Sequence, residues 1–153
     1  MNEQLDVKNM IHSLLESQLF CVLSTNLKED NYPYSSLIAF LYSEDLKHIY
    51  FTTSRNTTKF TNLLSDPRVG IFFDNRSNNL EDVHGAITAT VLGNVEELEK
   101  EKNKEIIEEF KTKYPQLKEF LIKRHTAFLR IRVESYVVVY EFKKVLRLEM
   151  NQI

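Results

Sequence analysis

The sequence predicts a mainly β protein: a small antiparallel barrel with added helices. Three observations support this fold class. Short apolar runs with polar residues at alternate positions recur along the chain, polar or proline-containing turns separate them, and one helical pattern follows the third run. Strands joined by short turns pair in antiparallel fashion, and about seven strands of similar length favour a barrel over a parallel α/β sheet.

Composition sets further bounds. With 153 residues, 42% of them hydrophobic, the chain is expected to form a single domain over 1–153 with a real core. A net charge of -2 gives no general reason to bind nucleic acid or an anionic membrane, so any anion site must be local. The single cysteine, Cys21, lies in an apolar run and is interpreted as a buried small hydrophobe in a reducing compartment. The start of the chain does not resemble a signal peptide and the apolar runs are too short to cross a bilayer, so we expect a soluble, cytoplasmic protein.

The elements are expected in the following order. Apolar residues at helical spacing predict a first helix over 5–16. Three strands joined by polar loops then form a meander, a helix spans 56–65, and two further strands follow a proline-marked turn. These five strands are expected at 18–25, 33–42, 47–53, after the turn at 66–67, and within 84–98.

The remaining chain is expected to return to helix and then to strand. A strongly charged pattern predicts a peripheral helix over 96–113, and a short helical turn follows over 114–122. Residues 126–142 are rich in β-branched and aromatic side chains and predict two final strands. In the long strand before them, apolar residues alternate with threonines, so one face is expected to be apolar and the other to present hydroxyls.

The most unusual stretch is FTTSRNTTKFTNLL, residues 51–64. It leads from an expected strand, through hydroxyl and amide side chains, into a helix start that offers Arg55 and Lys59 and no acidic residue. Helix N-termini carry a partial positive charge and normally attract acidic residues, so two cations here indicate a local anion site. The alternative is that the hydroxyls only cap the helix and the cations are only solvated.

Several kinds of site are excluded by the sequence. The three glycines are not clustered, so neither a Rossmann fingerprint nor a P-loop is present. None of the four histidines has a Cys or His at metal-ligand spacing, so no metal site is expected. No nucleophile elbow is present and no triad can be recognised from residue order, so catalytic residues stay unassigned.

The segment 20–97 resembles the pyridoxamine 5'-phosphate oxidase-like, FMN-binding split-barrel superfamily. Three pieces carry the resemblance: LFCVLSTNLKEDNYPYSSLIAF as a first hairpin, IYFTTSRNTTKFTNLLSDPRVGIFF as strand, phosphate loop, helix and strand, and GAITATVLGNVEEL as a long strand. The middle piece is the most specific. The resemblance implies a six- to seven-stranded antiparallel split barrel with peripheral helices, and an FMN bound at a homodimer interface.

The same resemblance implies which residues bind the cofactor. It makes Lys59 the phosphate-binding lysine, with Arg55, Thr57 and Thr58 in or near the same loop. The family often has a second basic residue directly before that lysine, where this chain has Thr58, and Arg55 is our candidate to compensate. The residues expected along the ribityl chain and the isoalloxazine ring are Thr52, Thr53, Ser54, Ser35, Ser36, Leu37 and Thr88.

Two function classes stay open at this point. One is an FMN-dependent oxidoreductase that acts on an unidentified small substrate or a nicotinamide coenzyme, with the flavin supplying the hydride chemistry. The other is a non-catalytic protein of the same fold that holds FMN, a deazaflavin coenzyme or haem. Because some superfamily members bind haem through a histidine, His84 and His125 are kept as candidate ligands.

A pyridoxamine 5'-phosphate oxidase proper is not expected. The true oxidases are longer and end in a segment rich in Arg and Trp, whereas this chain has no Trp and ends in KKVLRLEMNQI after its last expected strand. Arg130 and Arg132 alternate with apolar residues, as on any half-exposed strand, and are interpreted as structural. We also expect a homodimer that buries apolar surface such as Phe72 or Phe73.

Overall fold

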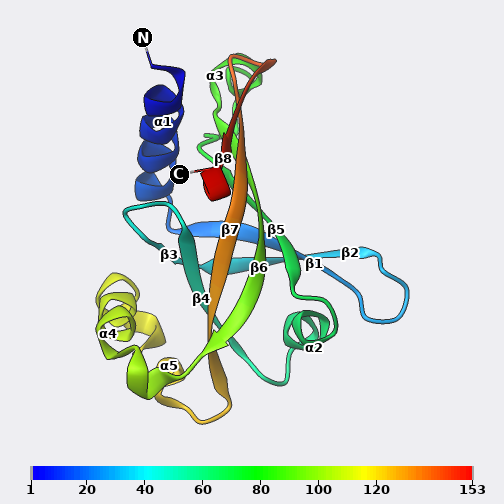
Figure 1. The fold of residues 1–153 in the computed structure, drawn as a ribbon, viewed down its shortest axis with the longest axis vertical. Coiled ribbons are helices and arrows are strands. Elements are labelled where there is room, and N and C mark those ends of the chain that lie inside the picture. The colour runs from blue at the N-terminus through cyan, green and yellow to red at the C-terminus, as the bar shows by residue number, and fades with distance from the viewer. Residues whose placement is uncertain (1, 153) are drawn as a thin grey trace.

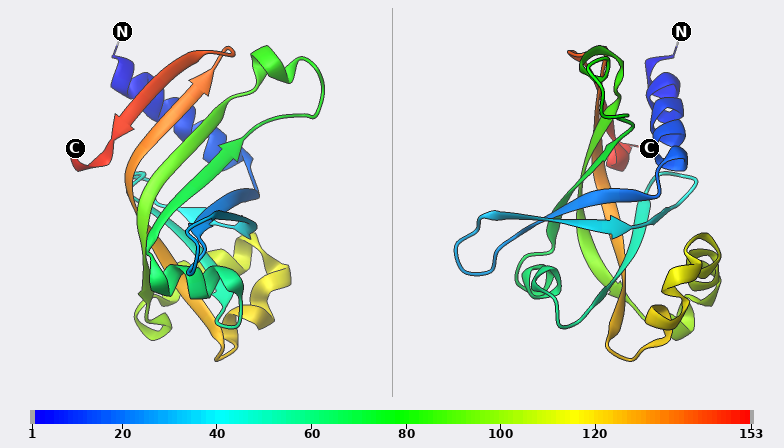
Figure 2. Two further views of the ribbon diagram at one scale, coloured as in Figure 1. Left: turned by 90° about the vertical axis from the view of Figure 1, so that its right-hand side faces the viewer. Right: turned by 180° about the vertical axis from the view of Figure 1, so that it is seen from behind.

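The computed structural model describes residues 2–152 and shows an antiparallel sheet that curls into a half-barrel (Figure 1). Helix α1 stands beside the upper part of the sheet, whereas α2 and the pair α4 and α5 lie around its lower part (Figures 1 and 2). The predicted antiparallel split barrel with peripheral helices is confirmed.

The sheet order is β2-β1-β5-β6-β7-β4-β3, with β8 paired to β7. The strands are β1 (Phe20–Asn26), β2 (Pro33–Ala39), β3 (Leu41–Tyr42), β4 (His48–Ser54), β5 (Arg68–Asp74), β6 (Thr88–Leu98), β7 (Thr126–Tyr140) and β8 (Lys144–Glu149). The predicted hairpin of the first two strands is present as β1 and β2. Strand β4 pairs with the distant β7, and this non-local pairing curls the sheet.

The helices lie between the strands. They are α1 (Glu3–Ser17), α2 (Thr58–Ser65), α3 (Asp82–Gly85), α4 (Lys104–Lys113) and α5 (Lys118–Ile122), with 3₁₀ turns η1 (Lys100–Lys102), η2 (Pro115–Leu117) and η3 (Met150–Gln152). The first predicted helix is confirmed: Asn2 caps α1, and Val7, Ile11 and Leu14 follow one another on its buried side. Across residues 2–152, no helix combines the length and apolar character that crossing a membrane would require.

The predicted strand 33–42 divides at Phe40. The phenol oxygen of Tyr114 accepts a hydrogen bond from the Phe40 amide at 3.2 Å and donates to the Phe40 carbonyl at 2.9 Å. Tyr114, 74 positions later in the chain, therefore makes the backbone hydrogen bonds with Phe40 that a neighbouring strand would otherwise make. This break gives the sheet one more strand segment, β3, than the sequence predicts.

The predicted helix over 96–113 is wrong in its first part. Strand β6 continues to Leu98, paired with β7, and α4 begins at Lys104. Near the end of this strand most residues are glutamates, so the alternation of apolar and polar residues that marks a strand is lost in the sequence. The charged run is therefore predicted as the start of the helix. The two strands predicted within 126–142 are one continuous strand, β7, and β8 comes from the segment after it.

The sheet separates two apolar clusters. The larger one lies on what we call the inner face, with α1 and α2 packed against it, and it includes Cys21, whose thiol pKa is raised by burial as expected for a buried hydrophobe. The smaller cluster lies on the opposite, outer face, between β4, β7 and the helices: Tyr50, Ile107, Phe110, Tyr114, Leu121 and Phe128. The helix predicted as peripheral therefore contributes a fully buried Phe110.

Helix α2 is held on the sheet by polar contacts as well as apolar ones. Asn62 and Thr25 are both 2% exposed, and the Asn62 amide donates to the Thr25 hydroxyl at 3.0 Å. At the end of the helix, Asn26 donates to the carboxylate of Asp66 at 3.0 Å. Because a buried amide without a partner is costly, these contacts fix where α2 sits along β1.

Gly93 lies where the pairing of β6 and β7 shifts register. A Cβ atom there would stand 2.5 Å from the backbone oxygen of Arg132 and 2.8 Å from Cγ2 of Ile131. We expect Gly93→Ala to lower the free energy of unfolding by about 1–3 kcal/mol, because a backbone oxygen cannot move aside easily. Urea unfolding measures this, with Gly85→Ala as the control, since no atom lies within 4 Å of a Cβ there. A loss at Gly93 no larger than at Gly85 would contradict the expectation.

Candidate functional site

The start of α2 is organised by Thr57. Its hydroxyl accepts the Phe60 amide at 3.2 Å, donates to the Ser54 carbonyl at 2.9 Å and lies 3.0 Å from the hydroxyl of Thr53. Thr57 is thus the N-cap, and no acidic residue lies in the first turn of the helix. The predicted helix start is present, and the capping that the sequence analysis gave as the alternative to an anion site is made by Thr57.

Lys59 is half-buried in the first turn of α2, and within residues 2–152 its ammonium group makes no hydrogen bond or ion pair. Leu63, one turn later and therefore on the same side of the helix, is buried in the main core. Burial lowers the pKa of Lys59. A partly desolvated cation and the positive helix end reinforce each other here, so the arrangement favours binding of an anion.

Arg55 has a different environment. Its guanidinium binds both carboxylate oxygens of Glu97 and lies 5.4 Å from the ring centroid of Phe60. Burial is the main cause that lowers the pKa of Lys100, and the nearby charge of Arg55 adds to it. The guanidinium of Arg55 is therefore engaged by Glu97.

The hydroxyl residues of β4 divide between the two faces of the sheet. Thr53 is 2% exposed and points to the inner face, where its hydroxyl meets Thr57. Neighbouring residues in a strand alternate, so Thr52 and Ser54 point the other way. Thr52 donates to the Ala127 carbonyl at 2.8 Å, and the hydroxyl of Ser54 accepts the Asn56 amide at 3.3 Å. The three predicted residues cannot all face one ligand. Thr58, at the helix start, makes no side-chain hydrogen bond within the described residues.

Strand β2 shows the same division. Ser36 pairs with the core residue Leu23 and so points to the inner face, the side on which α2 packs. Its hydroxyl is buried and has no hydrogen-bond partner among residues 2–152. Ser35 and Leu37 point outward: the Ser35 hydroxyl lies 3.1 Å from that of Ser24, and Leu37 is 67% exposed. A buried hydroxyl without a partner is rare, so Ser36 fits a site that a polar ligand group completes.

Thr88 is not brought to the start of α2. It pairs with Asp74 at one end of β5, whereas α2 connects to the other end of that strand. Strand β5 has seven residues, which corresponds to about 20 Å of strand. Within one chain, Thr88 and Lys59 therefore belong to different regions.

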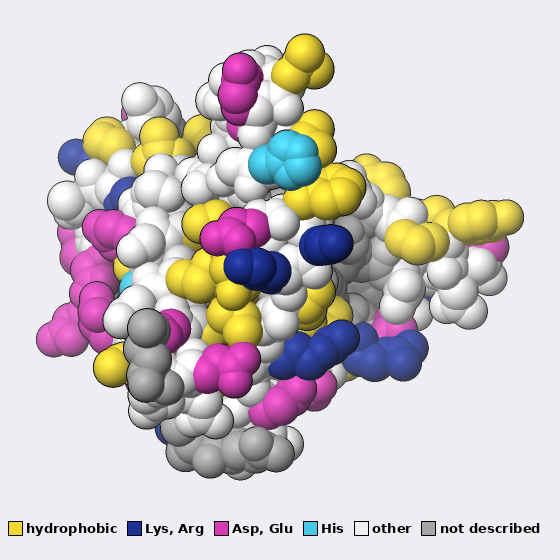
Figure 3. All heavy atoms as spheres, turned by 90° about the horizontal axis from the view of Figure 1, so that it is seen from above, with side chains coloured by type: hydrophobic (Ala, Val, Ile, Leu, Met, Phe, Trp, Pro, Cys, Tyr) yellow, Lys and Arg dark blue, Asp and Glu magenta, His cyan; other side chains and the backbone are white. Residues whose placement is uncertain are grey.

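An apolar row crosses the outer face. Leu37, Val22, Phe72, Thr90 and Val137 are paired in register across five neighbouring strands. Two further exposed residues adjoin the row, and we call these side chains together the outer apolar face: Phe20, Val22, Leu37, Phe72, Leu92 and Val137. Hydrophobic side chains are also exposed on the projecting β1–β2 hairpin (Figure 3). A continuous row of this kind is typical of an interaction surface.

The sequence profile of the pyridoxamine 5'-phosphate oxidase family matches residues 7–140, which run from within α1 to the end of β7. The chain belongs to the pyridoxamine 5'-phosphate oxidase family. No curated protein matches it at a significant level of sequence similarity.

Several solved structures have a similar fold, and some of them are cofactor-binding proteins. A protein related to general stress protein 26 from Clostridium acetobutylicum is 18% identical, with a TM-score of 0.74 and 99% of each chain covered. A haem-binding protein from Mycobacterium smegmatis is 15% identical (TM-score 0.81), and the alignment covers 99% of this chain and 59% of that one. An FAD-binding protein from Mesorhizobium loti is 18% identical (TM-score 0.67), with 85% and 91% covered. At these identities the likeness establishes the fold, and cofactor binding recurs within it.

Two cavities of the protein do not include Lys59 in their lining. One of about 770 Å³ lies beside α4 and β3 and is lined by five glutamates, which repel a phosphate. Another, of about 440 Å³, lies next to Arg55 and includes Glu97, Lys100 and Phe128.

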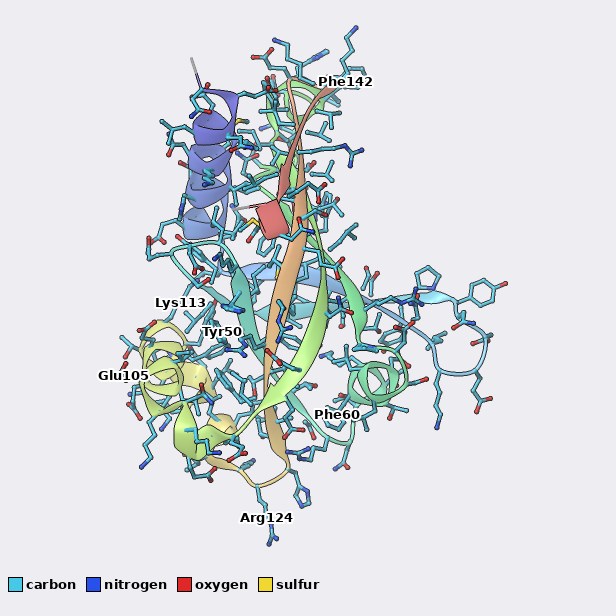
Figure 4. The ribbon with its side chains drawn as sticks, viewed as in Figure 1. Tyr50, Phe60, Glu105, Lys113, Arg124 and Phe142 are labelled. Carbon is cyan, nitrogen blue, oxygen red and sulfur yellow. The ribbon has the colours of Figure 1, made fainter. Side chains whose placement is uncertain are left out.

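The histidine candidates are separated from the start of α2 or lack supporting ligands. The ring of His84 lies 5.3 Å from that of Phe142, and Figure 4 shows Phe142 near the top of the molecule and Phe60 in its lower part. His125 is exposed, and its carbonyl accepts the Arg55 amide at 2.8 Å. In the part of the chain that the structure describes, no group of three His, Cys, Asp or Glu side chains could hold a metal ion.

The two strand arginines are already paired. Arg130 and Arg132 both bind Glu96, at 2.6 and 3.2 Å, and hydrogen bonds from Arg130 are the largest cause that lowers the pKa of that carboxyl. Their interpretation as structural residues of a strand face agrees with these contacts.

Sequence reasoning placed Glu97 both at the end of the long strand within 84–98 and at the start of the charged helix over 96–113, and did not connect it with Arg55. The signal was present: apolar residues at every second position, Val91, Gly93 and Val95, continue the strand alternation toward the glutamates.

Proposed function

We propose that this protein is an FMN-binding flavoprotein, an oxidoreductase that binds the phosphate of FMN at the start of α2. The observation that carries the proposal is Lys59, half-buried at an acid-free helix N-terminus with no counterion among the described residues. Family membership supports it, since the helix start coincides with the phosphate loop expected from the sequence.

The residues at the helix start have separate tasks. The free amides of the first turn and the ammonium of Lys59 bind phosphate oxygens, and Thr58 adds an unengaged hydroxyl. Thr53 and Thr57 hold the cap in shape through their own hydrogen bond. Ser36 offers its unpartnered hydroxyl to a polar group of the cofactor. The flavin itself supplies hydride chemistry when bound, with a small substrate or a nicotinamide coenzyme as the redox partner.

We further propose a homodimer formed through the outer apolar face. Leu37 and Phe72 are 67% and 37% exposed in the single chain, and Thr88 lies on the same face of the sheet. A second copy would cover this surface, and its Thr88 and Leu37 could reach a cofactor that one chain alone leaves open. Phe73, the other candidate from the sequence, is fully buried beside Phe40 and takes no part in the interface. We also propose a cytoplasmic location, because a buried, free cysteine such as Cys21 suits a reducing compartment.

The second candidate is a binding protein without turnover, holding haem or a deazaflavin coenzyme. The haem-binding neighbour favours keeping it. Against it, the ring of His84 lies beside Phe142, near the top of the molecule and away from Phe60 on α2, and His125 is an exposed residue of a turn. A deazaflavin coenzyme also carries a phosphate, so Lys59 would serve it equally well.

An absorption spectrum of the purified protein tests the proposal. Flavin bands that bleach on addition of reduced nicotinamide coenzyme would support the oxidoreductase. Flavin bands that do not bleach with any reduced coenzyme would support a flavin-binding protein without turnover. A haem Soret band would overturn the choice of FMN.

We expect no pyridoxamine 5'-phosphate oxidase activity. A second phosphate would require further free cations, and Arg130 and Arg132 are both engaged by Glu96. Incubation of FMN-loaded protein with pyridoxamine 5'-phosphate and oxygen measures this as pyridoxal 5'-phosphate formed. Turnover on the order of 0.1–10 per second would show that these arginines do bind substrate phosphate.

A further inference from the structure

The loop between β4 and α2 is tied to the barrel by one residue, Arg55. Its side chain binds Glu97, 42 positions later at the end of β6, through both guanidinium nitrogens. Its backbone amide donates to the carbonyl of His125, just before β7, at 2.8 Å. Arg55 also covers the ring of Phe60 in the first turn of α2. Three parts of the fold therefore meet at this side chain.

The geometry distinguishes this contact from an ordinary surface ion pair. An isolated surface ion pair held by a single contact between flexible side chains contributes little to stability. A bidentate arginine–carboxylate pair, in contrast, fixes the direction of the contact as well as its distance. The side chains of Arg55 and Glu97 are 38% and 40% exposed, so the pair lies at the surface and its bidentate geometry, not burial, sets it apart. The ring of Phe60 adds an attractive surface for the guanidinium.

A direct phosphate role for Arg55 conflicts with these contacts. Both terminal nitrogens are used by Glu97, and a carboxylate beside the guanidinium would repel a phosphate brought to it. Lys59, four positions later, is free of such a partner within residues 2–152.

We propose that the Arg55–Glu97 pair positions the phosphate-binding loop, and that Arg55 is a positioning residue rather than a phosphate ligand. This ion pair holds the neighbouring ends of β4, β7 and β6 against the first turn of α2. The amides of that turn and Lys59 then face the phosphate together. This inference rests on the proposed binding of FMN at α2.

The sign of the effect of Glu97→Gln tests the proposal. If Arg55 were a phosphate ligand, removing the competing carboxylate would leave FMN affinity unchanged or increase it. If the pair positions the loop, E97Q and R55Q should each weaken FMN binding about three- to fivefold, and the double variant should be no worse than either single. The variants E101Q and R124Q, which change similar charges in the same cavity, are the controls.

Riboflavin separates a local effect from a general one. It lacks the phosphate, so loss of loop positioning should leave its affinity unchanged while that of FMN falls. A general loss of stability would weaken both ligands equally and would overturn the proposal, as would wild-type FMN affinity in E97Q.

Hydrogen exchange on the apo-protein keeps the two proposals separate. Amides of residues 55–60 should exchange faster in R55Q and E97Q than in wild type or the two controls. Unchanged exchange overturns the positioning role whatever the ligand result. If the wild-type protein binds neither flavin but the exchange does increase, the cofactor assignment fails and the positioning of the loop stands.

Discussion

Lys59→Met is expected to weaken FMN binding by about 1.5–3 kcal/mol without destabilising the apo-protein. The substitution removes a charge-assisted contact with the phosphate but keeps an unbranched apolar stem of similar length. In the apo-protein the ammonium of Lys59 is partly desolvated and has no counterion among residues 2–152, so its loss should cost no stability. Affinity and stability should therefore move independently.

Fluorescence titration of the apo-protein with FMN measures the first quantity, and urea unfolding without ligand measures the second. Lys104→Met, at an exposed lysine in the first turn of α4, is the matched control and should change neither. Equal FMN affinity in the variant and wild type would sink the phosphate assignment. A strongly destabilised apo-protein would show instead that Lys59 is structural.

Phe72→Asp is expected to dissociate the proposed homodimer and to reduce cofactor binding along with it. Phe72 stands in the middle of the row that defines the outer apolar face, between Val22 on β1 and Thr90 on β6. In a two-fold interface the substitution would bury two carboxylates without partners, at a cost of about 3–5 kcal/mol of association.

Light scattering and FMN titration on the same samples test this expectation. Leu5→Asp, at an exposed leucine of α1 away from this face, is the control and should leave mass and affinity unchanged. A wild-type protein that is monomeric and binds FMN tightly would exclude the shared site. A dimeric F72D variant would place the interface on another surface.

Local patterns predicted the parts of the fold that depend on neighbouring residues. The alternation around Ala89 and Val91 is seen in β6, where both are fully buried, and Thr57 caps α2 with its own hydroxyl. The acid-free helix start led to Lys59, and the structure adds that this cation lacks a partner within residues 2–152.

Long-range contacts decide the parts that the sequence did not predict. Strand 33–42 breaks at Phe40 because Tyr114 binds its backbone, and nothing near position 40 signals this. Arg55 was expected to face the phosphate because it is close to Lys59 in the chain, but Glu97 takes its guanidinium from across the sheet. Residues expected together, such as Thr52 and Thr53, separate because a strand has two faces.

The buried contact between Asn62 and Thr25 fixes the distance between the start of α2 and the neighbouring strands. Sliding α2 along β1 by one turn would leave the buried Asn62 amide without its partner, so the helix start and the strands β1 and β2 keep a set separation. A ligand anchored at Lys59 must then span that separation by its own length. Flavin analogues with a shortened or lengthened chain between phosphate and ring should lose affinity in both directions, and an Asn62→Ala variant should tolerate them more evenly.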